Sequence, residues 1–226
     1  MHLRNKAGLF FLLVLIAACK KDKEEPVDFK YEYAPQTIGQ YCIYDVMEIF
    51  HDDAVSVHDT TIYQLKEKIE SGFVDDQGRP SLRLERSKLD TATGNWVVTD
   101  IWYSTRSVSR FEKVEEDERF IRLIFPVKAG SKWDGNAYNQ IGEWDYEYTD
   151  ADVARSYNGL NFANTARVLQ MDEYNFVQRQ LCYEVYAKNI GLVSKYYKFL
   201  DITAFDTTNA LTGKELYMNI TSYGVE

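Results

Sequence analysis

Two short histidine–aspartate clusters are the residues best suited to bind a metal ion. They are His51-Asp52-Asp53 and His58-Asp59, and imidazole and carboxylate groups are common ligands of divalent metals. A catalytic zinc site generally takes more protein ligands than a pair of histidines. The same polar residues also suit a hairpin loop between two strands, and we expect that structure. The sequence therefore predicts no metal ion and no other cofactor.

Pairs of acidic residues are the second group with chemical potential, because a glycosidase uses two carboxylates about 5–10 Å apart. The chain has 35 Asp and Glu residues, so pairs are expected by chance, and most lie in predicted turns. No Gly-x-Ser-x-Gly elbow, Ser-x-x-Lys motif or glycine-rich phosphate loop occurs. The sequence therefore predicts a non-enzymatic protein. The pairs considered are Asp75/Asp76, Glu143/Asp145 and Asp150/Asp152.

Cys42 and Cys182 lie in strand-like runs near opposite ends of the predicted domain. If early and late strands pair, a disulfide between them would close a long loop and contribute about 4–5 kcal/mol in the loop-entropy model. Two separate buried thiols are equally compatible with the sequence. We therefore leave both states open.

The third cysteine, Cys19, follows a typical export signal. Arg4 and Lys6 precede an apolar run over residues 7–18, which ends in two alanines. The run is shorter than the about 20 residues that a membrane-spanning helix needs, whereas its three-part pattern is that of a signal peptide. We expect a signal peptide over residues 1–18 and a lipidated flexible tether and entry segment over 19–36. A β-rich domain is expected over 37–226.

A cysteine placed directly after two alanines resembles the lipidation site of bacterial lipoproteins. The resemblance implies that the thiol of Cys19 carries a lipid, with fatty acyl groups such as palmitate anchoring the chain in a membrane. The tract from Lys20 to Glu25 resembles the charged export signal of Bacteroidota-type surface lipoproteins, although it holds more lysine than is typical. It implies the outer face of the outer membrane; a periplasm-facing orientation is the alternative.

Composition narrows the classes of partner. The net charge is −9 and becomes more negative once Arg4 and Lys6 are removed. A strongly acidic domain is poorly suited to nucleic acid or to anionic lipid headgroups. We expect no nucleic-acid partner, and membrane contact through the lipid anchor.

Short runs of alternating residues, separated by turn residues, predict a mainly β domain. Several runs are apolar on both sides, as in a sheet covered on both faces or curled on itself. We therefore predict one antiparallel, strongly curved sheet, a half-barrel or sandwich, with few short helical turns, one of them at Ala151 to Gly159. The predicted strands are 40–50, 60–71, 81–89, 96–104, 106–114, 119–127, 142–149, 165–171, 176–188, 192–200 and 214–223.

Aromatic residues make up 15% of the chain, and most of them are expected to fill the core. Trp144, Tyr146 and Tyr148 alternate along one strand and share a face that holds no aliphatic residue. Exposed Trp and Tyr side chains often form binding surfaces. These three residues are therefore our candidate binding surface.

Two segments resemble motifs of exported Bacteroidota lipoproteins of unknown function. The segment from Pro126 to Trp133 is similar to their Pro-x-x-x-Gly-x-x-Trp loop, and Tyr186 to Val193 is similar to a Tyr-Ala-x-x-Ile-Gly-Leu-Val hairpin. That family is similar to half-barrel envelope proteins of the lipoprotein-carrier type. The resemblance implies a curved antiparallel sheet around an apolar concavity, and no catalytic residues.

Three Asp-Thr pairs in predicted turns resemble the O-glycosylation sequon of Bacteroidota envelope proteins. The resemblance implies glycans on Thr60, Thr91 and Thr207. Asp-Thr is also favoured in exposed turns for its own hydrogen bonding, so both interpretations stay open.

These features predict a non-enzymatic, lipid-anchored envelope protein, a binding or assembly component of the cell surface. The alternative is a periplasmic or outer-membrane carrier that holds a lipid or other apolar ligand in the concavity of a half-barrel. A glycan, a lipid or an envelope protein are the partners considered. A carrier requires an open, dry and aliphatic concavity, whereas a binder requires an exposed aromatic patch.

Overall fold

The computed structural model describes residues 26–208 and 210–226, and most of them lie in antiparallel strands. The prediction of one curved, mainly β sheet is confirmed. The helical structure of the described residues consists of the 3-10 turns η1 (Tyr31–Tyr33) and η2 (Asp53–Val55). The strands are β1 (Gln40–Asp52), β2 (Val57–Val74), β3 (Pro80–Asp90), β4 (Asn95–Arg106), β5 (Arg110–Glu115), β6 (Glu118–Ile124), β7 (Lys132–Asp134), β8 (Asp145–Tyr157), β9 (Leu160–Tyr174), β10 (Gln178–Ala187), β11 (Gly191–Asp201) and β12 (Thr212–Val225).

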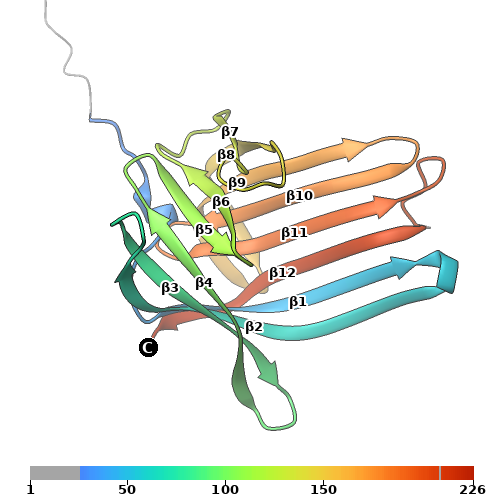
Figure 1. Cartoon of the computed structure of the whole chain (residues 1–226), viewed down its shortest axis with the longest axis horizontal. Helices are drawn as coiled ribbons and strands as arrows, with labels where there is room; N and C mark the ends of the chain where they lie inside the picture. Colours follow the sequence, from blue (N-terminus) through green and yellow to red (C-terminus); the bar gives the residue numbers. More distant parts are fainter. Residues whose placement is uncertain (1–25, 209) are drawn as a thin grey trace, which may run out of the picture.

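The strands form one 12-stranded sheet in the order β6-β5-β4-β3-β2-β1-β12-β11-β10-β9-β8-β7. Each half of the chain is a meander, and the first and last strands pair in the middle of the sheet (Figure 1). The two end strands approach one another, because the Ile121 backbone N–H donates to the Gly135 carbonyl at 2.8 Å. The indole N–H of Trp133 donates to the Ile121 carbonyl at 2.8 Å. These two hydrogen bonds make a seam that nearly closes the curled part of the sheet.

The β8–β9 hairpin differs from the prediction. A helical turn was expected at Ala151 to Gly159, but β8 continues through Tyr157 and turns at Asn158 and Gly159, both with positive φ. The register of β8 against β9 shifts at three places between Tyr148 and Arg155. Such bulges break the alternation of apolar and polar residues, so the sequence pattern of a strand is lost there.

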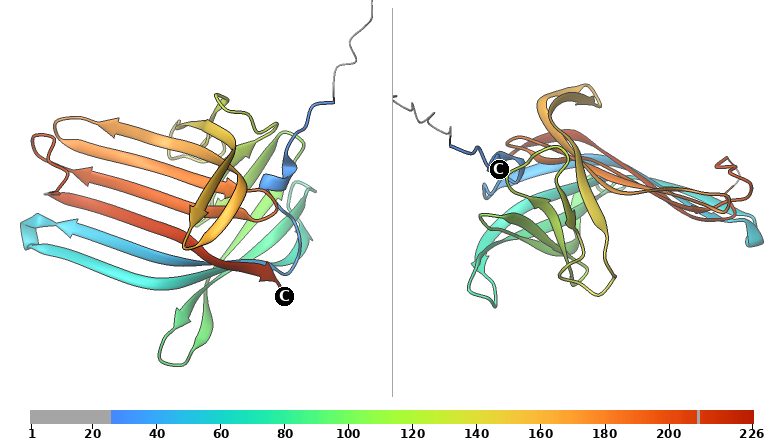
Figure 2. Two further views of the ribbon diagram at one scale, coloured as in Figure 1. Left: turned by 180° about the vertical axis from the view of Figure 1, so that it is seen from behind. Right: turned by 90° about the horizontal axis from the view of Figure 1, so that it is seen from above.

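Part of the sheet extends beyond the curled half as a single layer, which we call the platform (Figures 1 and 2). It comprises the segments of β1, β2, β9, β10, β11 and β12 that lie nearest the β1–β2, β9–β10 and β11–β12 turns. Side chains directly opposite one another in antiparallel neighbours project to the same face. We call the face that carries Tyr197 and Leu216 the inner face, because Leu216 also lines the cavity described below. The opposite face is the outer face.

The core extends into the segment that was expected to be a tether. Tyr33 and Ala34 are 0% and 1% exposed and belong to a cluster with Leu123, Tyr148 and Tyr186. The Tyr33 hydroxyl also donates to Asp152 at 2.9 Å. Residues of the predicted entry segment, in and next to η1, therefore pack into the same core as the sheet.

Gly135 provides a test of the packing at the seam. A Cβ atom at this position would lie 2.4 Å from the ring of Tyr146, which is 1% exposed. We expect Gly135→Ala to lower the free energy of unfolding by about 1–3 kcal/mol, as overpacking of a buried site does. Urea unfolding would measure the change. Gly72→Ala is the matched control, since its Cβ would have ordinary contacts at 3.8 Å or more; equal losses in both variants would contradict the packing argument.

Candidate functional site

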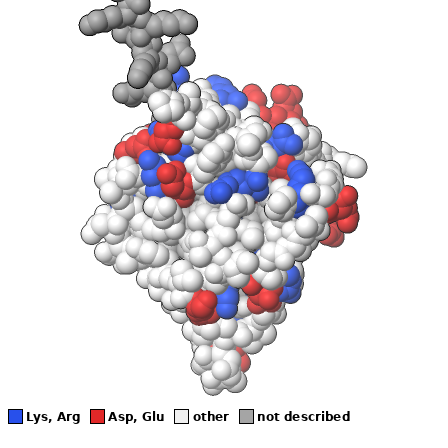
Figure 3. Space-filling view, turned by 90° about the vertical axis from the view of Figure 1, so that its left-hand side faces the viewer, with Lys and Arg blue, Asp and Glu red and all other residues white. Residues whose placement is uncertain are grey.

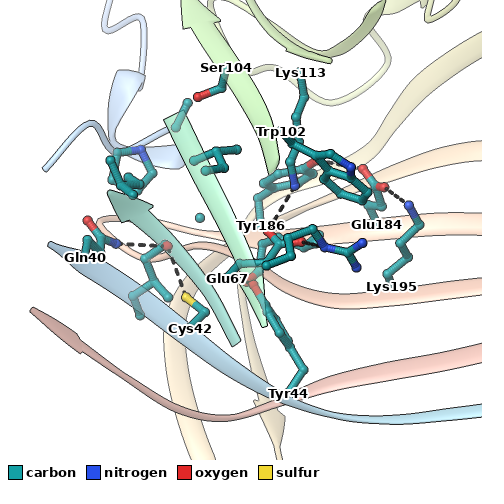
Figure 4. Close-up of a pocket in the computed structure, with 18 of the residues that line it drawn as sticks. Gln40, Cys42, Tyr44, Glu67, Trp102, Ser104, Lys113, Glu184, Tyr186 and Lys195 are labelled. Carbon is teal, nitrogen blue, oxygen red and sulfur yellow. Dashed lines mark hydrogen bonds and ion pairs between the residues drawn. The ribbon is translucent and has the colours of Figure 1, made fainter. Parts of the chain in front are cut away.

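A cavity of about 140 Å³ lies inside the curled half of the sheet. Figure 4 shows the rings of Tyr44, Trp102 and Tyr186 around it, together with charged side chains from both halves of the meander. Tyr44 and Tyr186 are 1% and 4% exposed. The cavity therefore brings charged groups into contact with buried aromatic surface.

Three carboxylates and four cations form a network along this interior. Glu67 pairs with Arg86 and with Lys113, both at 3.0 Å. Glu115 pairs with Arg122 at 2.9 Å. Burying an ion is costly unless an opposite charge accompanies it, and here every carboxylate of the network has a cation next to it.

Glu184 is the most enclosed member of this network, at 1% exposure. Its carboxylate lies 3.2 Å from Lys195 and 3.6 Å from Arg122, and it accepts a 2.6 Å hydrogen bond from the Tyr186 hydroxyl. Glu184 comes from β10 and Arg122 from β6, which are far apart in strand order. The network therefore links opposite sides of the curled sheet through its interior.

The network keeps its carboxylates ionised. Burial by itself would raise the pKa of Glu115, but the charges of Arg122, Lys195 and Lys113 outweigh it and hold that pKa at about 2. Burial also opposes ionisation of Glu67 and Glu184, yet the neighbouring cations lower the pKa of each. A general acid works best with a pKa near the operating pH. The shifts of these three carboxyl groups instead move their pKa values further below neutral pH.

The cavity differs from the concavity that an apolar-ligand carrier requires. Small-molecule pockets usually enclose about 300–1,000 Å³, whereas this one measures about 140 Å³ and mixes apolar side chains such as Leu84 and Met218 with the charged Glu67 and Lys195. The cavity is therefore small, and its lining is not purely aliphatic. The carrier alternative stays a prediction.

A row of apolar side chains crosses the outer face of the platform from strand to strand. Tyr183 lies opposite Tyr196, Tyr196 opposite Tyr217, Tyr217 opposite Met47, and Met47 opposite Ile62. We call these five residues the outer row. The first four are partly exposed, and Ile62 is 73% exposed. The strand register thus assembles one continuous apolar surface from five separate segments.

The tyrosines of the outer row pack against one another. The rings of Tyr183 and Tyr196 are stacked with centroids 5.1 Å apart, and the Tyr217 ring meets Tyr196 edge-on at 4.9 Å. The guanidinium of Arg167 lies 4.0 Å from the centre of the Tyr183 ring. Cross-strand aromatic pairs of this kind stabilise a sheet, so the outer row is held in a fixed arrangement.

The predicted binding surface of Trp144, Tyr146 and Tyr148 is corrected. Tyr146 and Tyr148 are 1% and 0% exposed, because they lie at the seam where the sheet nearly closes. The Tyr148 hydroxyl donates to the Ile124 carbonyl at 2.9 Å and accepts from the Ile124 N–H at 3.0 Å. Trp144 is half-buried and stacks on Phe199 at 5.8 Å. These residues therefore connect strands rather than present a surface.

Cys42 and Cys182 are separate buried thiols. Their strands, β1 and β10, are separated by β12 and β11, which at about 4.8 Å per strand places them about 14 Å apart. Disulfide formation needs Cα atoms within about 7 Å. Burial also raises the pKa of each thiol to about 12. The sequence left a disulfide and two separate thiols open, and the structure contains the two separate thiols.

The acidic pairs considered for catalysis lie on the surface or in ion pairs with neighbouring cations. Asp75 pairs with Arg79, and Asp150 pairs with Arg155. Asp152 pairs with Lys188 at 2.9 Å. The remaining members, Asp76, Glu143 and Asp145, are exposed.

The modification sites predicted from the sequence stay predictions. Thr60, Thr91 and Thr207 are all exposed, although Thr60 lies within β2 and not in a turn as expected. Glycosylation of these residues remains a prediction. Cys19 lies outside the described residues, and its lipidation likewise remains a prediction. Among residues 26–208 and 210–226, no helix is long and apolar enough to cross a membrane.

Comparison with known proteins gives remote similarities of structure. No family model matches the chain, and no curated protein matches it. An inferred exported protein with a YmcC-like fold from Bacteroides fragilis is 11% identical, with a TM-score of 0.42, over 83% of this chain and 98% of the other. An inferred lipoprotein from Parabacteroides distasonis is 12% identical, with a TM-score of 0.38, over 87% and 100% of the two chains.

The fold and its sites define a class of protein: a single curved β-sheet with a charged interior and a platform that carries an outer apolar row. Figure 3 shows the surface at the curled end, where basic and acidic residues lie in small mixed groups around a stretch with neither. The charges of both signs are thus interspersed on this face.

Proposed function

We propose that this chain is a non-catalytic, lipid-anchored protein of the cell envelope that binds another protein through the outer row. The outer row carries the proposal, because it is a continuous apolar surface on a rigid sheet. Protein interfaces are enriched in Tyr and Met side chains and depleted of charge at their centre. Tyr196 and Tyr217 occupy the middle of the outer row, where a hot spot is expected.

The packing of the rings favours a protein over a glycan as the partner. A sugar binds an aromatic residue by stacking on the flat face of its ring. The faces of Tyr183 and Tyr196 are turned toward each other at an interplanar angle of 10°. One face of each of these rings is therefore covered, and Met47 with the exposed Ile62 adds aliphatic surface beside them, which suits an apolar protein surface.

The interior supports the non-catalytic part of the proposal. Its carboxylates are paired with cations, and the pKa of Glu115 is held far below neutral. Burial raises the pKa of the Cys42 thiol to about 12, and such thiols are poor nucleophiles. These groups stabilise the fold, and none of them is tuned for proton transfer at neutral pH.

The position of the platform suits a protein anchored by its N-terminal end. The described chain begins at the curled half of the sheet, and the platform extends from the opposite side (Figure 1). With a lipid on Cys19, the platform would project away from the anchoring end. We place the protein in the outer membrane facing outward, on the basis of the charged tract after Cys19; a periplasm-facing orientation is the alternative.

Site-specific photo-crosslinking in cells tests the proposal. A photoreactive phenylalanine analogue at Tyr196 should form a crosslink to a discrete protein. The same analogue at Tyr197 should not, because this neighbouring residue lies on the inner face. Charge in the outer row, introduced as Met47→Asp, should weaken binding about 30-fold or more, as loss of a hot spot does. The thermal midpoint of the variant checks that it stays folded.

Two results would overturn the proposed function. One is equal crosslinking from Tyr196 and Tyr197, which would indicate contact without a preferred face. The other is a Tyr196 crosslink that persists unchanged in a folded Met47→Asp variant. Products without added protein mass would point to a lipid or glycan instead.

A further inference from the structure

Two histidines meet at the tip of the β1–β2 hairpin, at the far end of the platform (Figure 1). His51 lies directly opposite His58, on the outer face, and their Nδ1 atoms are 3.1 Å apart. The ring centroids are 5.3 Å apart at an angle of 63°. The chain has three histidines in total, so the fold brings two of them into one contact.

A buried carboxylate fixes the orientation of His51. The Nε2 atom of His51 lies 3.1 Å from Glu215 of β12, which is 8% exposed. Lys198 and the Tyr217 hydroxyl hold that carboxylate at 2.8 and 2.6 Å. A carboxylate at Nε2 favours the tautomer with its proton there. The lone pair of His51 Nδ1 then accepts from His58 Nδ1–H, and His58 must release that proton for both nitrogens to bind one ion.

The spacing of the two nitrogens fits coordination of one metal ion. Imidazole nitrogens bind zinc at about 2.0–2.1 Å. Two nitrogens at that distance from one ion, at octahedral to tetrahedral angles, are about 2.9–3.4 Å apart. The observed 3.1 Å lies within this range. His58 is exposed, so its ring can turn to direct Nδ1 toward an ion that arrives from solvent.

We propose that the Nδ1 atoms of His51 and His58 together bind one divalent transition-metal ion of the kind that prefers imidazole, such as Zn²⁺. Within residues 26–208 and 210–226, no group of three or more His, Cys, Asp or Glu side chains is placed to share one ion. The two imidazoles are therefore the protein ligands, and water completes the coordination. Glu215 acts as a positioning residue.

The proposed site departs from the prediction made from the sequence, which treated His51, His58 and the neighbouring aspartates as a polar loop without metal. Asp59 lies opposite Phe50 in the strand register and projects to the other face from the histidines. The carboxylate that completes the arrangement, Glu215, comes from the C-terminal strand. Strand alternation thus separates Asp59 from the histidines, and the carboxylate next to His51 is that of Glu215, which is distant in the sequence.

Calorimetric titration with Zn²⁺ tests the site. The full-length chain would carry His2→Ala and no histidine-containing tag, so that His51 and His58 are the remaining imidazoles. We expect one equivalent of Zn²⁺ to bind, and ¹⁵N spectra of the imidazoles to show coordination at Nδ1 of both. His51→Ala and His58→Ala should each weaken binding by at least about tenfold, because removal of even an outer partner of a metal ligand typically costs about 10- to 100-fold.

Two further variants separate coordination from a general effect of the hairpin. Asp59→Asn, in the same hairpin but on the other face, should bind Zn²⁺ as the parent does. Glu215→Gln should weaken binding by about 10- to 100-fold while both ligands remain. Absence of binding in the parent at millimolar Zn²⁺, or binding unchanged by both histidine variants, would overturn the proposal. The contact would then be a hydrogen bond between the two rings.

Discussion

Replacing Arg122 by methionine should lower the free energy of unfolding by about 3–5 kcal/mol, the usual effect of removing one partner of a buried ion pair. Arg122 is 5% exposed and lies between Glu115 at 2.9 Å and Glu184 at 3.6 Å. Methionine keeps much of the side-chain volume but removes the charge. Both carboxylates would stay buried with Lys195, at 3.9 and 3.2 Å, as their shared cation.

Urea unfolding followed by tryptophan fluorescence would measure this loss. Lys132→Met is the matched control, because the Lys132 side chain is 65% exposed and its pair with Glu147 lies at the surface. Exposed pairs contribute about 0–1 kcal/mol. Losses of similar size in both variants would contradict the role given to the interior network. Adding Glu115→Gln to Arg122→Met should recover part of the loss, since it removes one of the uncompensated charges.

Acid should destabilise the protein between pH 4.5 and about 2, because the carboxylates of the network must stay ionised. The pKa of Glu115 falls from 4.5 to about 2 on folding. A group with a lowered pKa in the folded state contributes stability above its unfolded pKa, and this is lost as pH falls toward the folded pKa. At about 1.4 kcal/mol per unit, Glu115 contributes about 3 kcal/mol. The lowered pKa values of Glu67 and Glu184 act in the same direction.

Unfolding free energies at several pH values between 7 and 2.5 would show this dependence. Glu115→Gln should be less stable than the parent at pH 7 and should lose less stability on acidification, because the group that titrates is absent. The two curves should converge as the pH falls toward about 2. Parallel curves over the whole range would show that the charge on Glu115 does not stabilise the fold.

Local patterns in the sequence were sufficient to predict the type of structure. Alternation predicts strands such as β4 and β6. The break between the predicted strands 176–188 and 192–200 was also correctly placed, since Asn189 and Gly191 within it adopt the positive φ of a turn. The short β7 and the bulged end of β8 were missed. A strand of three residues has too few positions to show alternation, and a bulge shifts the alternation by one residue.

The sites depended on contacts that the sequence order does not show. Tyr183, Tyr196 and Tyr217 lie in three different predicted strands, and only the register places them in one row. Trp144 and Tyr146 form an alternating aromatic pattern in the sequence, but the burial of Tyr146 depended on how β6 approaches β7 and β8. The histidine site needed Glu215, which lies 164 residues after His51.

The sequence by itself determined that this chain is a mainly β protein and predicted an export signal, because strand periodicity, turn chemistry and signal peptides are properties of neighbouring residues. The tertiary structure decided which side chains are buried and which meet. Pairing of β1 with β12 brings the first and last described strands together in one sheet, and the seam between β6 and the segment after β7 encloses its charged interior. Burial and contact are properties of residues distant in sequence, so they are defined only once the sheet has formed.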